Sequence, residues 1–176
     1  MAEGGRVRHI GAAARSSPGP VCYGRDMTPQ ERAARIQGLL KGLDRILGVE
    51  VTEADKAAVR LRLPVTEAHH QIHGIVHGGL YCTLVESACS IGAWMVATES
   101  GQEIVGLDQS TSFLRAVRSG TLEVLATPLQ AGRRVQLWQA EIRDDQGRLA
   151  ATGKLRLLNL APGATVGGEG LAKTTF

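Results

Sequence analysis

The first hydrophobic pattern in the chain has the spacing of a helix. Thr28 and Pro29 open it, since Thr favours a helix cap and Pro favours the first turn. Apolar side chains then recur every three or four residues, at Ile36, Leu39, Leu40, Leu43 and Leu47. The pattern therefore predicts one amphipathic helix over residues 28–47, ended by Gly48.

From Val49 onward the pattern alternates. Apolar and charged side chains take turns through the run Val59-Arg60-Leu61-Arg62-Leu63. Alternation with a period of two places the apolar residues on one face of a strand. We therefore expect a half-buried strand in this segment, and Pro64 closes its clear part.

The second half of the chain predicts a buried helix and a sheet. Residues 80–98 contain no proline and are apolar almost all round a helical wheel, so this helix must be covered on most sides. Four strand-like runs follow, separated by turn sequences, at 103–115, 121–130, 133–143 and 149–159. The order lacks the βαβ alternation of a parallel sheet. It predicts an α+β fold in which one antiparallel sheet wraps around a long central helix.

We expect one domain, at residues 27–160, between two flexible ends. Residues 1–26 contain four arginines but no apolar stretch long enough for a secretory signal, although an organelle transit peptide stays open. Residues 161–176 are rich in glycine, which predicts a flexible tail.

Composition and charge limit the partners. The net charge of +3 is mild, and the arginines are scattered among acids, so a nucleic-acid surface is not expected. A small polyanion such as coenzyme A needs only two or three arginines. Glu86 and several Ser and Thr residues interrupt the most apolar window, so we expect no membrane span. An odd set of cysteines without metal-ligand spacing favours a reducing, cytoplasmic setting: Cys22, Cys82 and Cys89.

Glu86 is the only charged residue of the central helix before Glu99. Burial disfavours an ionised carboxylate, and enzymes use such settings to tune a base or a nucleophile. The alternative is that Glu86 faces solvent or pairs with an arginine.

Gly78 and Gly79 open the same helix. Without side chains, they let a ligand approach the unpaired N–H groups at the positive end of the helix dipole, and such donors suit a thioester carbonyl that becomes an oxyanion. The alternative is a tight turn that requires positive φ angles. Gly78 and Glu86 are eight residues apart, about 12 Å along a helix, so one chain cannot bring both to one carbonyl. Two helices packed antiparallel about a twofold axis can, which predicts a homodimer or a homotetramer with composite sites.

The segment from Gln71 to Ser87, QIHGIVHGGLYCTLVES, resembles the signature of hotdog-fold thioesterases of the phenylacetate-pathway and 4-hydroxybenzoyl-CoA type. The resemblance extends from about Val49 to Leu160. It implies a hotdog fold and hydrolysis of an acyl-CoA to the free acid and coenzyme A, without a metal or an organic cofactor. Many relatives carry Asp at the position of Glu86, and the 4-hydroxybenzoyl-CoA branch shares the Glu.

The resemblance also assigns roles to site residues. Gly78 N–H would polarise the thioester carbonyl, and Glu86 of the facing subunit would attack it or activate water. Gln71 matches a polar residue beside the thioester or the nucleophile, and Ser90 matches a position that holds the attacking water. Gly79 would help to bind the substrate.

The remaining polar residues have weaker assignments. Four histidines suggest a metal, but glycines interrupt any helix that would hold them; His77 is expected to hold the turn, with a catalytic role as the alternative. Cys82 is expected to be a packing residue. Arg115, Arg133 and Arg134 could bind the phosphates of coenzyme A or simply lie on a solvated sheet. Asp108 could contact the acyl pocket, although a structural hydrogen bond is favoured. The histidines are His69, His70, His73 and His77.

Two other functions use the same features. A hotdog enoyl-CoA hydratase or dehydratase would combine a His and a carboxylate on the same helix. A non-catalytic acyl-CoA-binding protein would need a DNA-binding or partner module, and the single predicted helix at 28–47 offers no helix-turn-helix pair.

Overall fold

The computed structural model describes residues 27–171. The predictions about residues 1–26, including Cys22, and about residues 172–176 lie outside the described residues.

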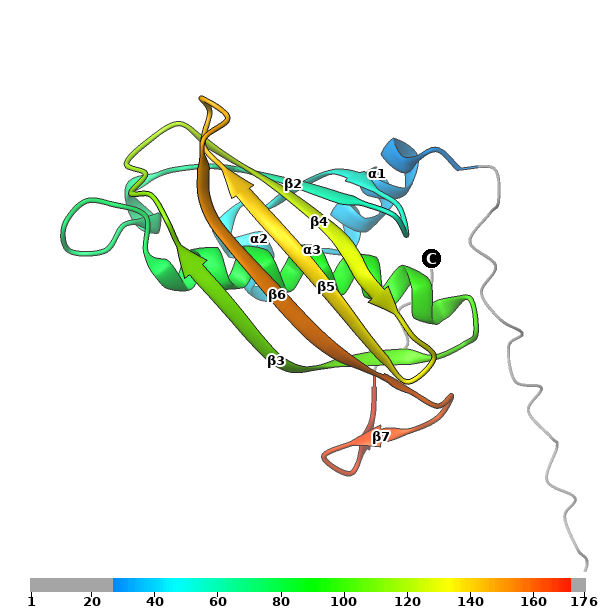
Figure 1. Ribbon diagram of the computed structural model, residues 1–176. Coiled ribbons are helices and arrows are strands. Elements are labelled where there is room, and N and C mark those ends of the chain that lie inside the picture. The colour runs from blue at the N-terminus through cyan, green and yellow to red at the C-terminus, as the bar shows by residue number, and fades with distance from the viewer. Residues whose placement is uncertain (1–26, 172–176) are drawn as a thin grey trace, which may run out of the picture.

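One six-stranded antiparallel sheet wraps around one long helix, α3 (Gly78–Thr98), as Figure 1 shows. The strand order is β1-β2-β4-β5-β6-β3, so β3 lies at one edge of the sheet. The predicted antiparallel α+β architecture is confirmed, and all four predicted strands after α3 are present. The strands are β1 (Glu50–Ala54), β2 (Val59–Pro64), β3 (Glu103–Phe113), β4 (Thr121–Ala131), β5 (Val135–Arg143) and β6 (Leu149–Leu160).

The prediction of one helix over residues 28–47 was wrong. The segment forms α1 (Pro29–Leu39) and α2 (Gly42–Leu47), because Leu40 leaves the helical conformation with a ψ of 129° and Gly42 has a φ of +56°. The predicted start is present: Thr28 caps α1 and exchanges hydrogen bonds with Glu31. The break removes Leu43 from the buried stripe, and its side chain is 55% exposed.

The single strand predicted between Val49 and Pro64 is a hairpin of β1 and β2. A bulge between Val51 and Glu53 shifts the register of β1, which blurs its alternation in the sequence. Gln37 ties α1 to this hairpin. Its amide donates to the Val49 carbonyl at 3.2 Å and its oxygen accepts from Val51 N–H at 2.6 Å, so α1 is held beside β1.

Glycine allows α3 to approach the sheet closely. A Cβ atom at Gly92 would lie 2.4 Å from the ring of Trp138, a fully buried residue of β5. Gln136 is also fully buried; it donates to the Ala93 carbonyl at 2.9 Å and accepts from the Trp138 indole at 3.0 Å. These contacts fix α3 on the concave face of the sheet.

Glu86 and the Ser and Thr residues of α3 interrupt its apolar window less than predicted. Of the described helices, α3 alone is long and apolar enough to cross a membrane by length and composition. More than half of it is buried against the rest of the chain, as in the core helix of a soluble domain, which passes the same test.

The segment after β6 has some regular structure. Within the predicted tail, β7 (Thr165–Val166) pairs with β8 (Glu169–Gly170) in a short exposed hairpin. Leu171 follows this hairpin and lies close to β3 and α3.

Candidate active site

His77 caps the start of α3. Its Nδ1 atom accepts a hydrogen bond from Gly79 N–H at 2.8 Å. Among residues 27–171 no group accepts a hydrogen bond from Gly78 N–H. The cap therefore satisfies the second amide of the helix and leaves the first one available at the positive end of the dipole.

Close packing explains why Gly78 and Gly79 are glycines. Neither residue has a positive φ, so the tight-turn alternative was wrong. A Cβ atom at Gly78 would lie 2.9 Å from the Phe113 ring, and one at Gly79 would lie 3.0 Å from the His77 ring. Phe113, which stands at the end of β3 and is 55% exposed, thus lies against the first residue of the helix.

Glu86 is exposed in the single chain, so the expectation that it is buried was wrong. Within the described part of the chain it forms no ion pair, which excludes the alternative of a paired arginine there. It lies on a stripe of α3 that the sheet does not cover. The other exposed or half-buried members of this stripe are Gly79, Cys82, Thr83, Ser90 and Trp94.

The buried cysteine of α3 is a poor nucleophile in this setting. Cys89 is fully buried, and burial, together with the nearby Glu86 carboxylate, raises the pKa of its thiol to about 12. Cys82 is half-buried, and its carbonyl accepts a hydrogen bond from Gln109 of β3 at 3.0 Å.

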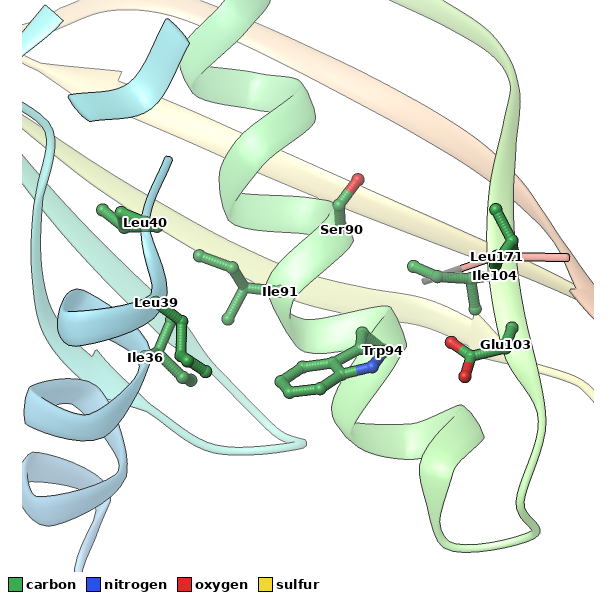
Figure 2. A pocket seen from close by; sticks show the side chains of 9 residues that line it. All are labelled: Ile36, Leu39, Leu40, Ser90, Ile91, Trp94, Glu103, Ile104 and Leu171. Atoms are coloured by element: carbon green, nitrogen blue, oxygen red, sulfur yellow. The ribbon is translucent and has the colours of Figure 1, made fainter. Parts of the chain in front are cut away.

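An apolar groove of about 460 Å³ continues the uncovered stripe past Ser90 (Figure 2). Ile91 and the Trp94 ring extend toward α1, while Ser90 points to the side of β3. Apolar side chains at the end of α1 and at the residue that follows it form one wall. The opposite wall includes Glu103, whose carboxylate points toward α3. The wall residues are Ile36 and Leu39 of α1 and Leu40 after it on one side, and Glu103, Ile104 and Leu171 on the other.

Because α3 is continuous, Gly78 and Glu86 lie about 12 Å apart along its axis. Gln71 lies in the turn before α3, where its side-chain oxygen accepts a hydrogen bond from His73 N–H. Ser90 is one helical turn beyond Glu86 on the same face. Gln71 thus lies in the turn that leads into Gly78, whereas Ser90 lies beside Glu86 on α3 itself.

The predicted phosphate-binding residues do not meet in one chain. Arg115 directly follows β3, whereas Arg133 and Arg134 occupy the β4–β5 turn, near the opposite end of β3. Strand β3 separates these ends by about 30 Å. All three arginines are exposed. Asp108 is exposed as well, and its carboxylate accepts a hydrogen bond from Arg156 Nε at 2.7 Å.

The histidines have separate structural contacts. His69 is buried, and its ring nitrogens contact the Leu47 carbonyl and Thr66 N–H, each at 3.0 Å. His70 Nε2 lies 2.8 Å from the Arg118 carbonyl. In the range 27–171 no three His, Cys, Asp or Glu residues lie close enough together to hold a metal.

Comparison with known proteins identifies the family. The sequence pattern of the thioesterase superfamily matches residues 73–151. The Mycobacterium tuberculosis protein Rv1847 is 40% identical over 119 residues, which are 66% of this chain and 85% of that protein. The chain belongs to the thioesterase superfamily.

A solved structure and a further sequence relative agree with this assignment. The thioesterase HI1161 of Haemophilus influenzae superposes with a TM-score of 0.70 at 30% identity, covering 74% of this chain and 91% of that one. The 1,4-dihydroxy-2-naphthoyl-CoA hydrolase of Escherichia coli is 37% identical over 93 residues, 53% of this chain and 68% of that protein. The hotdog fold and the thioester hydrolase activity implied by the sequence are thereby confirmed. Hydrolysis is favoured over the hydratase and the non-catalytic alternatives.

Sequence reasoning missed one contact of this thioesterase. Arg118 lies in the turn sequence between the predicted strands 103–115 and 121–130, yet its guanidinium contacts the segment that carries Gln71. The sequence holds no signal for this role, because the atoms that Arg118 contacts are backbone carbonyls.

Proposed function

We propose that this thioesterase hydrolyses an acyl-CoA to the free acid and coenzyme A at a site shared by two chains. The observation that carries the proposal is the pairing, on one rigid helix, of the free Gly78 N–H with the uncovered Glu86 about 12 Å away. A coenzyme A thioester is favoured because a relative with 37% identity is named as the hydrolase of one.

The uncovered surfaces support a homodimer. β3 is an edge strand of 11 residues, and the stripe of α3 that includes Glu86 faces solvent beside it. A second chain related by a twofold axis can cover both surfaces and bring its Glu86 to Gly78 of the first. A homotetramer built from such dimers meets the same requirement.

In the proposed reaction, Gly78 N–H of one chain polarises the thioester carbonyl. Glu86 of the partner either attacks the carbonyl carbon or takes a proton from water held by Ser90, and Gln71 contacts the thioester or the nucleophile. In both routes water supplies the oxygen of the acid, the C–S bond breaks and the sulfur of coenzyme A leaves as a thiol.

The groove beyond Ser90 offers room for the acyl group, because its lining is apolar apart from Ser90 and Glu103. The same twofold arrangement brings the end of β3 near Arg115 in one chain toward the end near Arg133 and Arg134 in its partner. We propose that these exposed cations bind the phosphates of coenzyme A. Asp108 is already engaged by Arg156 and is left out of the proposed site.

A thiol-release assay over a panel of acyl-CoAs tests the proposal. Glu86→Gln and Glu86→Ala should each lower kcat by about 10²- to 10⁴-fold, the range for loss of a positioned acid or base. Glu123→Gln, an exposed carboxylate of β4 that lies 3.7 Å from Arg62, is the matched control. Hydrolysis at the wild-type rate in both Glu86 variants, with the oligomer intact, would refute the mechanism.

A further inference from the structure

Arg118 binds the turn that precedes α3. One nitrogen of its guanidinium, Nη1, donates to the carbonyl of His73 at 3.0 Å and to that of Gly74 at 3.1 Å. Arg118 has no ion-pair partner in the part of the chain that the structure describes. Its positive charge is therefore directed at the two backbone oxygens, and such charge-assisted hydrogen bonds are stronger than neutral ones.

The backbone of residues 117–118 also contacts the two arms of this turn, which are residue 70 on one side and residue 76 on the other. The Val117 carbonyl accepts from Val76 N–H at 2.8 Å, and the Arg118 carbonyl lies 2.8 Å from His70 Nε2. Residues 70 and 76 also form a β-bridge. Segment 117–118 thus contacts the turn on both arms and, through the guanidinium, at its tip.

The turn has little freedom once Arg118 is in place. Gly74 adopts a φ of +67°, which points its carbonyl and that of His73 toward Arg118. Gln71 N–H donates to the Ile75 carbonyl and Gly74 N–H donates to the Gln71 carbonyl, each at 2.9 Å. The position of Gln71 therefore depends on a turn whose tip Arg118 fixes.

The turn leads directly to the carbonyl-binding end of α3. Val76 is followed by His77, whose N–H donates to the His69 carbonyl at 2.9 Å and whose ring caps the helix, and then by Gly78. We propose that Arg118 is a positioning residue, which holds Gln71 and Gly78 in the geometry that the thioester requires. This inference rests on the proposed function of that site.

Arg118 is exposed, so its loss should change the site more than the stability of the fold. A misplacement of about 1 Å in an active site can cost about 10²-fold in rate. We therefore expect Arg118→Ala to lower kcat by about 10- to 100-fold and to change KM by less than about threefold. Arg118→Lys should recover much of kcat, because an ammonium group can also donate to both carbonyls.

The experiment compares Arg118→Ala, Arg118→Lys and the control Arg62→Ala, an exposed arginine of β2 that does not contact the turn. Thiol release gives kcat and KM for each protein. Added guanidinium ion should raise the kcat of Arg118→Ala but not that of the other proteins. Hydrogen exchange of residues 70–79 gives a readout without substrate. Exchange there should be faster in Arg118→Ala than in wild type, with the rest of the protein unchanged.

Two results would overturn the inference. One is a kcat of Arg118→Ala within about twofold of wild type; the other is unchanged exchange of residues 70–79. If Arg118→Ala fails to fold, Arg118→Lys decides. A loss of activity in Arg118→Lys that is accompanied by a lower melting temperature counts against a positioning role. A wild-type protein that hydrolyses no acyl-CoA refutes the proposed function, and the exchange experiment then still tests the contact by itself.

Discussion

At the scale of single residues, the first two backbone N–H groups of α3 differ in their hydrogen bonding. The His77 ring satisfies Gly79 N–H, whereas Gly78 N–H has no acceptor within residues 27–171, as its proposed contact with the thioester requires. Both positions need glycine for space rather than for backbone conformation, because the rings of His77 and Phe113 lie where a Cβ atom would be. A larger residue at Gly78 would displace Phe113 and cover the free amide.

The cysteines of α3 provide a test at this scale. With a pKa of about 12, only about one Cys89 thiol in 10⁵ is ionised at pH 7, and the thiolate is the form that attacks a thioester. Cys89→Ala should therefore keep the rate of thiol release within about threefold of wild type, and Cys82→Ser should do the same if Cys82 is the packing residue that the sequence predicts. A loss of more than about 100-fold in either variant, with the fold intact by circular dichroism, would favour a cysteine nucleophile over Glu86.

At the scale of the elements, the contact between α3 and β5 sets where the site lies. Gly92→Ala places a methyl group 2.4 Å from the Trp138 ring, and overpacking of this kind costs about 1–3 kcal/mol. Denaturant unfolding should show that loss. Gly38→Ala is the control, since nothing beyond the adjacent residues and backbone of α1 lies within 4 Å of its added Cβ, and it should raise the stability. Equal effects at the two positions would contradict the packing account.

The β5–β6 turn gives a pH-dependent prediction. The Arg148 side chain, which donates from Nε to Asp144 Oδ2 at 2.8 Å, lowers the pKa of Asp144, and the N–H groups of Arg148 and Gln146 add to the effect. A lowered pKa stabilises the fold above the unfolded value near 3.8, and this contribution disappears as the pH falls through the folded value.

Asp144→Asn should therefore lower the melting temperature at pH 7, and the difference from wild type should shrink below about pH 4. Thermal unfolding between pH 7 and pH 2.5 measures it, with the exposed neighbour variant Asp145→Asn as the control. A difference that stays constant over this range would show that the charge of Asp144 does not contribute.

The elements also show what the sequence could predict. The central helix and the four strands after it were predicted from their hydrophobic periods, because turn residues separate them clearly. The break between α1 and α2 was missed because the helical spacing of Leu39, Leu40 and Leu43 continues across it. The hairpin of β1 and β2 was missed because a bulge interrupts the alternation of β1.

At the scale of the whole molecule, the burial of Glu86 was predicted wrongly because the apolar pattern of α3 does not say which chain covers which face. Eleven residues of α3 are buried within their own chain, whereas the stripe with Glu86 faces solvent. The pattern thus combines contacts within one chain with a surface that a second chain can cover. Arg118 was missed for a related reason, since its contacts are formed only by the folded turn.

The composite site is the central claim, and mixing two inactive variants tests it most directly. Glu86→Ala leaves Gly78 intact, and Gly78→Val leaves Glu86 intact while its side chain collides with Phe113. Random exchange of subunits makes about half of the dimers hybrids, each with one complete site out of two.

Each variant alone should release almost no thiol from an acyl-CoA. The equal mixture, after verified subunit exchange, should recover about one quarter of the wild-type activity. Activity of the mixture no higher than that of the separate variants, despite hybrid dimers detected by native mass spectrometry, would contradict a site shared between two chains.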